Sequence, residues 1–151
     1  MKLFAVLVSL LTFVSCTSTE KIYVGTGSPD GMFLLELDEK DGSLTKLYQQ
    51  NDVKGPGFLT FSPDKKFLYC VASGNKIRAY KIEADGSLKF LNEKSSTGNG
   101  PCHIEASKNG KSVVVANYGS GDTTVVSVGA DGSLSGEPRN HSHKGFDAPS
   151  P

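Results

Sequence analysis

A repeated unit of about 45 residues constrains the fold of this chain more than any other feature. The tetrapeptide Asp-Gly-Ser-Leu occurs at residues 41–44, 85–88 and 131–134. Apolar runs that begin at Lys21, Phe67 and Ser112 keep the same period. Gly-Pro pairs at residues 55–56 and 100–101 repeat it again. Self-similarity at a fixed period of this length is typical of a protein built by stacking copies of one structural unit.

Each unit has the pattern of short β-strands joined by tight turns. Asp-Gly pairs and Asn109-Gly110 supply the positive φ that two-residue hairpins need, and Pro63 fixes φ for a turn. We expect four strands in each of the last two units, over residues 57–62, 67–73, 76–83 and 87–93 and over residues 102–107, 112–118, 123–129 and 133–141. The first unit begins with the equivalent of a second strand, residues 21–27, so its innermost strand is missing.

Four strands in about 45 residues are typical of one blade of a β-propeller. The second strand of a unit is apolar at consecutive positions, as at Val113, Val114 and Val115, so both of its faces must be covered. The sequence therefore predicts an all-β propeller of about three four-stranded blades. The absence of tryptophan argues against a WD40 repeat, and a two-sheet sandwich of the same hairpins is the alternative. Propellers have four to eight blades, so we expect residues 21–151 to be the N-terminal, incomplete part of a longer propeller domain.

The first 15 residues have the pattern of a secretory signal peptide. Lys2 precedes an apolar run over residues 3–14, which as a helix would reach only about 18 Å and is too short to span a bilayer. The run ends at Ser15-Cys16, which is similar to a bacterial lipoprotein signal in which Cys16 is lipidated. Residues 16–20 would then be a tether to a membrane surface, and simple cleavage with Cys16 unmodified is the alternative. We expect an exported bacterial protein, either periplasmic or an outer-membrane lipoprotein.

Charge and cysteine content exclude several classes of function. The chain has 16 basic and 16 acidic residues, so nothing attracts it to nucleic acid. Cys70 and Cys102 each fall in or beside an expected strand, and we predict buried free thiols for both. No Cys or His cluster has metal-ligand spacing, so we expect neither a metal site nor another cofactor.

The third unit contains most of the polar residues that could bind a ligand. In a blade, the start of strand one and the end of strand two lie at the same face of the disc. This brings His103 close to Asn117, Tyr118 and the Gly119–Asp122 loop, and the end of strand four brings His141 and His143 there as well. An imidazole can accept a proton near neutral pH, and the amide and hydroxyls can orient polar oxygens of a ligand. Structural roles for the same side chains, in turns or in packing, are the alternative.

These residues lie in motifs that resemble the lactonase family of seven-bladed β-propellers. The motifs are residues 23–26, Ser62-Pro63-Asp64, Gly100-Pro-Cys-His-Ile104, Val115-Ala-Asn-Tyr-Gly-Ser-Gly121 and His143-Lys-Gly145. The resemblance implies that the full-length protein hydrolyses a sugar lactone, such as 6-phosphogluconolactone to 6-phosphogluconate, without a cofactor.

The family pattern also carries over residue by residue. His103, Asn117, Tyr118 and His143 match motif positions and would bind or position substrate. The family's catalytic Arg and Glu motifs have no counterpart here, so the catalytic residues would lie beyond residue 151 and the chain alone would be inactive. Arg78 and Arg139 fall on expected outer strands and are poor candidates for contacting a phosphate. The alternatives are a non-catalytic exported propeller that binds glycan or protein, and a cycloisomerase acting on carboxymuconate.

Overall fold

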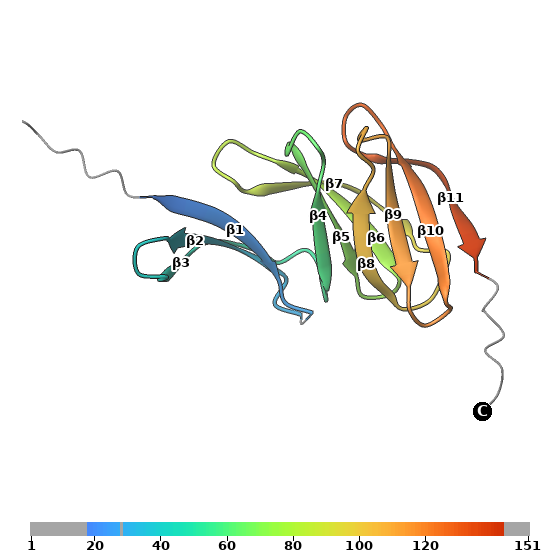
Figure 1. The fold of residues 1–151 in the computed structure, drawn as a ribbon, viewed down its shortest axis with the longest axis horizontal. Coiled ribbons are helices and arrows are strands. Elements are labelled where there is room, and N and C mark those ends of the chain that lie inside the picture. Colours follow the sequence, from blue (N-terminus) through green and yellow to red (C-terminus); the bar gives the residue numbers. More distant parts are fainter. Residues whose placement is uncertain (1–17, 28, 144–151) are drawn as a thin grey trace, which may run out of the picture.

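The computed structural model describes residues 18–27 and 29–143 (Figure 1). The predicted signal peptide and Cys16 lie outside this part of the chain. Within it, eleven β-strands follow one another, and β1 and the eight strands of the last two units lie within two residues of the ranges expected for them. The strands are β1 Thr19–Gly25, β2 Met32–Asp38, β3 Leu44–Gln50, β4 Phe58–Phe61, β5 Phe67–Ala72, β6 Lys76–Ile82, β7 Leu88–Ser95, β8 Pro101–Ala106, β9 Ser112–Asn117, β10 Asp122–Val128 and β11 Leu134–Ser142.

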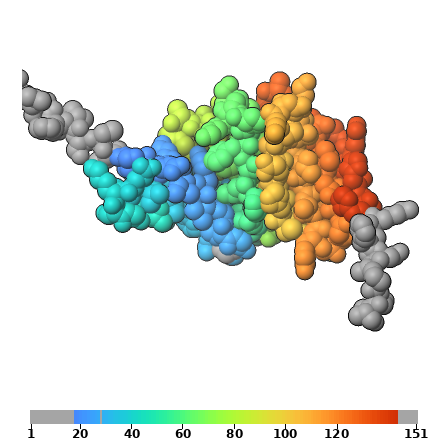
Figure 2. All heavy atoms as spheres, viewed as in Figure 1, coloured from blue at the N-terminus to red at the C-terminus, as the bar shows by residue number. Residues whose placement is uncertain are grey.

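The strands form three antiparallel sheets, each of which pairs consecutive strands only. The first sheet has the order β1-β2-β3, the second β4-β5-β6-β7 and the third β8-β9-β10-β11. The sheets stand side by side in chain order, and the space-filling view shows neighbouring sheets in close contact (Figure 2). This arrangement confirms an all-β fold of propeller blades. Among residues 18–27 and 29–143, the first sheet has three strands, and none of them lies at the innermost position beside β1.

The burial of β5 shows that the second sheet is covered by another sheet on each of its two faces. Its consecutive residues 68–72 are all buried. Leu68 and Cys70 pack in a core shared with the first sheet, whereas Tyr69 and Val71 pack in a core shared with the third. Because successive side chains of a strand point to opposite faces, the second sheet contributes to two cores at once.

β9 has the same apolar sequence pattern but is covered on one side only. Val113 and Val115 are buried against the second sheet, while Val114 between them is 36% exposed. The outer face of the third sheet therefore has no partner among the described residues.

The turns adopt the backbone conformations that their sequences favour. Gly42, Gly86 and Gly132 of the three Asp-Gly-Ser-Leu copies have φ values of 74°, 92° and 82°. In each copy the aspartate carboxylate accepts a hydrogen bond from the serine backbone N–H two residues later. This bond fixes the turn. Hydrogen bonds from the serine also hold the pKa of each aspartate below its usual range: the backbone N–H has the larger effect for Asp41, and the serine hydroxyl has the larger effect for Asp85 and Asp131.

β1 begins two residues earlier than expected, within the segment interpreted as a tether. Thr19 pairs with Asp38, and the Thr19 hydroxyl donates to Glu36 at 3.3 Å. Within the described residues β1 pairs with β2 alone, so the edge of β1 where an innermost strand would lie is open.

Candidate functional site

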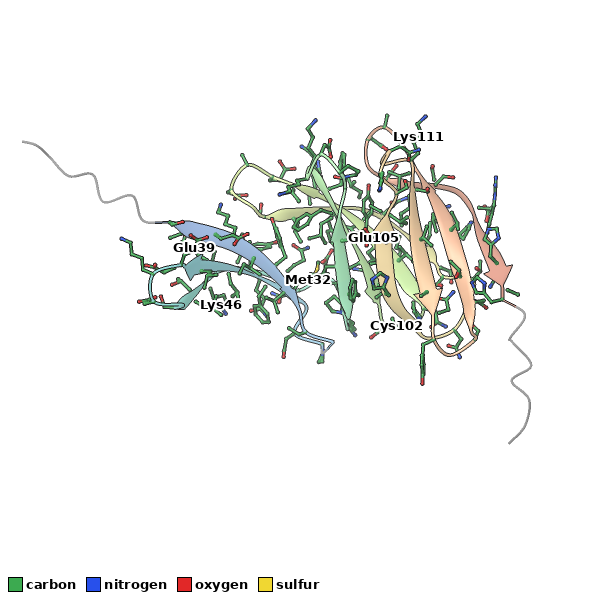
Figure 3. The ribbon with its side chains drawn as sticks, in the orientation of Figure 1. Met32, Glu39, Lys46, Cys102, Glu105 and Lys111 are labelled. Atoms are coloured by element: carbon green, nitrogen blue, oxygen red, sulfur yellow. The ribbon has the colours of Figure 1, made fainter. Side chains whose placement is uncertain are left out.

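The antiparallel register brings the predicted site residues to one end of the third sheet. Pro101 at the start of β8 pairs with Asn117 at the end of β9, and Asp122 at the start of β10 pairs with Ser142 near the end of β11. Cys102 lies at this end of the sheet and Lys111 at the opposite end (Figure 3). The inner strands β4 and β8 contact each other, so the second sheet contributes to the same region.

A β-bulge at Cys102 shapes the start of β8. Pro101 pairs with Asn117 and His103 with Ala116, so Cys102 is an extra residue that has no paired residue in the ladder with β9. A bulge changes the direction of the side chains around it. Cys102 is consequently an exposed free thiol, and the prediction that it is buried is wrong. Cys70, in the middle of β5, is the buried free thiol that the sequence predicts.

His103 lies against an aromatic ring of the neighbouring blade. Its ring centroid is 4.3 Å from that of Phe58 on β4, with an angle of 48° between the planes. Both side chains remain exposed. The contact leaves the histidine accessible while the phenylalanine restricts its orientation, which is what a group that holds a ligand oxygen requires.

Next to this pair is a cavity of about 260 Å³ between the second and third sheets. Four of the nine residues that line it are glycines, and the full lining is Gly55, Gly57, Val71, Ala72, Ser73, Gly74, Asn75, Gly100 and Pro101. A side chain on Gly55 would collide with the Ser73 hydroxyl, so a glycine here lets the two loops approach closely. The N–H groups of Gly57, Ser73 and Gly100 in this lining already donate hydrogen bonds within the protein.

Asn75 holds the loops around this cavity together. It has a positive φ of 55°, and its side-chain oxygen accepts a hydrogen bond from the Gly100 N–H at 3.1 Å. Its amide nitrogen lies 3.2 Å from the Asn99 side-chain oxygen, and its carbonyl accepts from Ser96. Asn75 thereby joins the second blade to the loop that leads into the third.

Asn117 is buried, with 2% of its surface exposed. Its Nδ2 donates to Asp122 at 2.7 Å and to Thr124 at 2.9 Å, and its Oδ1 accepts from the Ser96 hydroxyl at 2.6 Å. The side chain therefore uses its hydrogen-bonding capacity inside the protein and supports the loop that follows β9. It does not reach the surface as a direct ligand contact would require.

Tyr118 is the reverse case, because its side chain is 87% exposed. Its backbone N–H donates to the Gly100 carbonyl, which ties the loop after β9 to the start of β8. The Ser120 hydroxyl accepts from the Asn99 N–H in the same way. Tyr118 thus projects from a loop that is fixed at two points.

His141 and His143 lie at the same end of the sheet but further out, on and just after β11. His143 Nε2 is 2.7 Å from the Thr123 hydroxyl, and Thr123 pairs with His141 in the ladder. Hydrogen bonds from Asn140 and Asn117 hold the pKa of the neighbouring Asp122 below its usual value, and the charge of His143 adds a smaller effect. His141 and His143 thus share the predicted end of the sheet with His103, and none of the three histidines is among the residues that line the cavity.

The two arginines differ from one another. Arg139 lies on β11, the outermost strand of the third sheet, as expected. Arg78 lies on β6, which is flanked on both sides, and its guanidinium pairs with Glu93 at 2.9 Å and with Asp52 at 3.9 Å. The prediction that Arg78 is on an outer strand is wrong. Its ion pairs nonetheless occupy the guanidinium, which leaves it a poor candidate for contacting a phosphate.

The sequence motifs select none of Gly57, Phe58 and Asn75 as a site residue. The sequence does not show that Phe58 contacts His103, because that contact depends on β4 lying beside β8 in the folded chain. The described residues contain no group of three or more His, Cys, Asp or Glu side chains that could hold a metal ion. No helix in residues 18–27 and 29–143 is long and apolar enough to cross a membrane.

Known proteins match both the sequence and the fold. The family model for the lactonase, 7-bladed beta-propeller, matches residues 18–151. A 6-phosphogluconolactonase of Bacillus subtilis is 30% identical over 130 residues, which are 82% of this chain and 37% of that protein.

Two solved structures are similar over nearly the same part of the chain. One is a candidate 6-phosphogluconolactonase from Bacteroides fragilis, with a TM-score of 0.73 and 28% identity over 89% of this chain and 38% of that one. The other is a periplasmic gluconolactonase from Pseudomonas aeruginosa, with a TM-score of 0.71 and 27% identity over 83% of this chain and 39% of that one. The chain therefore spans well under half the length of the proteins it matches.

Proposed function

Because the chain belongs to the lactonase family of seven-bladed β-propellers, we propose that its protein hydrolyses a sugar lactone, with 6-phosphogluconolactone as the substrate and 6-phosphogluconate as the product. The 6-phosphogluconolactonase of Bacillus subtilis, at 30% identity, supports this choice of substrate. The observation that carries the proposal is the polar end of the third sheet, where the exposed His103, held against Phe58, lies close to a glycine-rich cavity that begins at Gly57 and Pro101.

The described residues suit the binding of a lactone better than its opening. Opening a lactone requires a base that activates water and donors that stabilise the developing oxyanion. We assign to His103 and Tyr118 the orientation of ring and hydroxyl oxygens of the substrate. His143 would act at the periphery, and Asn117 would fix the loop that carries Tyr118. The base and the cations that a phosphate needs would come from residues outside the described part of the chain.

We also propose that the protein acts outside the cytoplasm. The apolar run before Cys16 supports export, and the similar periplasmic gluconolactonase of Pseudomonas aeruginosa shows that one relative with this fold works in the periplasm. Lipidation of Cys16 would then hold the protein at a membrane surface. Metabolic labelling with a fatty-acid analogue, compared between the natural protein and a Cys16→Ser variant, tests this: label should be incorporated only when Cys16 is present.

The activity is tested on the whole protein, expressed from its complete gene. Hydrolysis of 6-phosphogluconolactone and of unphosphorylated aldonolactones is measured as acid release and corrected for spontaneous opening. We expect a clear excess over the blank. His103→Ala should lower kcat/KM about tenfold, the size of effect that follows from losing one good hydrogen bond to a ligand.

Lys108→Ala serves as the control, because Lys108 is exposed on the turn at the opposite end of the third sheet. It should leave the rate unchanged. If no lactone opens faster than the blank, the proposal fails. Glycan or protein binding without turnover would then support the non-catalytic propeller, and turnover of carboxymuconate would support the cycloisomerase.

A further inference from the structure

Asn75 adopts a backbone conformation that favours glycine. Its φ is 55°, and Lys65 is the only other non-glycine residue with a positive φ in the described part of the chain. Asn75 lies directly before β6, the third strand of its unit. The equivalent positions of the first and third units, directly before β2 and β10, hold Gly31 and Gly121, with φ values of 81° and 64°. The second unit therefore has a side chain where the other two have none, although glycine would fit this backbone with less strain.

The Asn75 side chain binds the loop that leads into β8 of the third blade. Its Oδ1 accepts a hydrogen bond from the Gly100 N–H at 3.1 Å, and its Nδ2 donates to the Asn99 Oδ1 at 3.2 Å. We call Asn99 and Gly100 the bridging segment. Because glycine at position 75 could make neither bond, the contact with the bridging segment accounts for the asparagine at this position.

The bridging segment is connected to both of the exposed residues assigned to substrate binding. The Gly100 carbonyl accepts a hydrogen bond from the Tyr118 N–H at 2.9 Å, and the Asn99 carbonyl accepts one from the Gly119 N–H at 3.0 Å. His103 lies on β8, only three residues after Gly100. A displacement of the bridging segment would therefore move the loop that carries Tyr118 and the start of β8 together.

We propose that Asn75 is a positioning residue for the candidate site: it fixes the bridging segment to the second blade and thereby holds the Tyr118 loop and the start of β8 in place. The inference rests on the proposed function, in which Tyr118 and His103 orient the substrate. Asn75 acts through the bridging segment, and the base and the oxyanion donors lie elsewhere. Its loss should therefore weaken substrate binding and leave the chemical step nearly unchanged.

Asn75→Gly in the whole protein, expressed from its complete gene, tests this role, because glycine keeps the positive φ and removes both side-chain hydrogen bonds. We expect KM for 6-phosphogluconolactone to rise about tenfold, the size of effect that follows from losing a hydrogen bond. The kcat should change by less than about twofold. Asn75→Asp keeps an acceptor for the Gly100 N–H, so its KM should lie between the two. An unchanged KM in Asn75→Gly would overturn the proposal.

Lys65→Gly is the matched control. Lys65 has nearly the same φ, 56°, and its exposed side chain lies in the turn between β4 and β5, at the opposite end of the second sheet from Asn75. Any general effect of placing glycine at a positive φ should appear in both variants, whereas the rise in KM should appear only in Asn75→Gly. Equal changes in KM in the two variants would contradict the positioning role.

Hydrogen exchange provides a second test that does not depend on turnover. In Asn75→Gly the N–H groups of Tyr118 and Gly119 should exchange about tenfold faster than in the natural protein, because the carbonyls that they bind are held less firmly. The N–H groups in the middle of β5 should exchange as before. Unchanged exchange at Tyr118 and Gly119 would show that the proposal is wrong, even in a protein that hydrolyses the lactone. If the natural protein opens no lactone, the proposed function fails, and faster exchange at these two groups would still support the positioning role.

Discussion

The ionisation of Tyr69 is tied to the contact between the second and third blades. Its hydroxyl is buried between two blades and donates to the Gly132 carbonyl. Burial, together with the charges of Asp64 and Asp131, raises the pKa of Tyr69 to about 12. The folded state therefore stabilises the neutral, protonated hydroxyl of Tyr69.

Stability should decline at alkaline pH for this reason. A pKa raised above the unfolded value near 10 means that the stabilisation is complete below about pH 10 and is lost as the pH rises through about 12. We expect Tyr69→Phe to be less stable than the natural chain at neutral pH by about 1 kcal/mol, the usual contribution of a hydrogen bond. It should also lose less stability between pH 10 and pH 12. Urea unfolding at several pH values measures both effects.

Tyr118→Phe is the matched control, because this hydroxyl is on an exposed side chain. Identical alkaline profiles for Tyr69→Phe and Tyr118→Phe would contradict the assignment to Tyr69.

The two described cysteines should differ sharply in reactivity. Burial raises the pKa of the Cys70 thiol to about 12, so its thiolate is scarce and inaccessible. Cys102, at the bulge, is exposed. Peptide mapping after brief alkylation of the folded protein should find Cys102 modified and Cys70 unmodified, and both should react in denaturant. Modification of Cys70 in the folded protein at the rate of Cys102 would show that β5 opens readily.

Residue type alone could not predict which side chains of a motif are buried and which are exposed. Asn117 and Tyr118 are neighbours in one motif, yet one is 2% exposed and the other 87%. A strand alternates its faces, so adjacent residues meet different surroundings, and the sequence does not say which face the next blade covers. The same limit explains the wrong expectation for Cys102, because the bulge that exposes it depends on the register between β8 and β9.

At the scale of elements, a polar cluster joins the second and third blades. Ser96 and Thr97, just after β7, meet Asn117 on β9 and Thr124 on β10 through side-chain hydrogen bonds of 2.6–3.1 Å. Ser96, Asn117 and Thr124 are buried, so each polar group depends on the others for its partner.

Removal of Asn117 should therefore affect stability more than substrate affinity. Asn117→Ala leaves the Ser96 and Thr124 hydroxyls short of partners, and we expect a loss of about 2–3 kcal/mol in the free energy of unfolding. Denaturant unfolding measures this loss, and lactone kinetics of the protein produced from its own gene should show little change in KM at temperatures where the variant is folded. A KM raised more by Asn117→Ala than by Tyr118→Phe would contradict the supporting role.

The strands themselves were predictable because their boundaries are set locally. Asp-Gly and Asn-Gly pairs fix the hairpins, and every strand of the last two blades lies within two residues of its expected range. The loops that form the cavity were less predictable, since their shape depends on contacts between blades such as that of Asn75 with Gly100.

At the scale of the whole molecule, two sheet faces are left without partners among the described residues. Val24 and Leu44 mark one, and Val114 marks the other. Blades stabilise one another through such faces, and exposed apolar patches promote association. The 151-residue chain in isolation should therefore self-associate as its concentration rises, which sedimentation velocity measures.

Val24→Thr combined with Leu44→Ser should reduce that association, whereas Lys108→Ser, on an exposed turn, should not. A monodisperse natural chain that melts cooperatively would contradict this prediction.

The pairing of consecutive strands has a consequence for synthesis of the protein. A ribosome adds about 5–20 residues per second, so one blade of about 45 residues emerges over several seconds, whereas a hairpin forms in microseconds. Each sheet can thus be complete before the next is made. The Tyr23 and Tyr69 hydroxyls of the first two blades, however, donate to Gly86 and Gly132, and each glycine lies 63 residues further along the nascent chain. Each of these two blades can therefore form alone on the ribosome, but it gains its hydrogen bond to the next blade only when translation has delivered that blade.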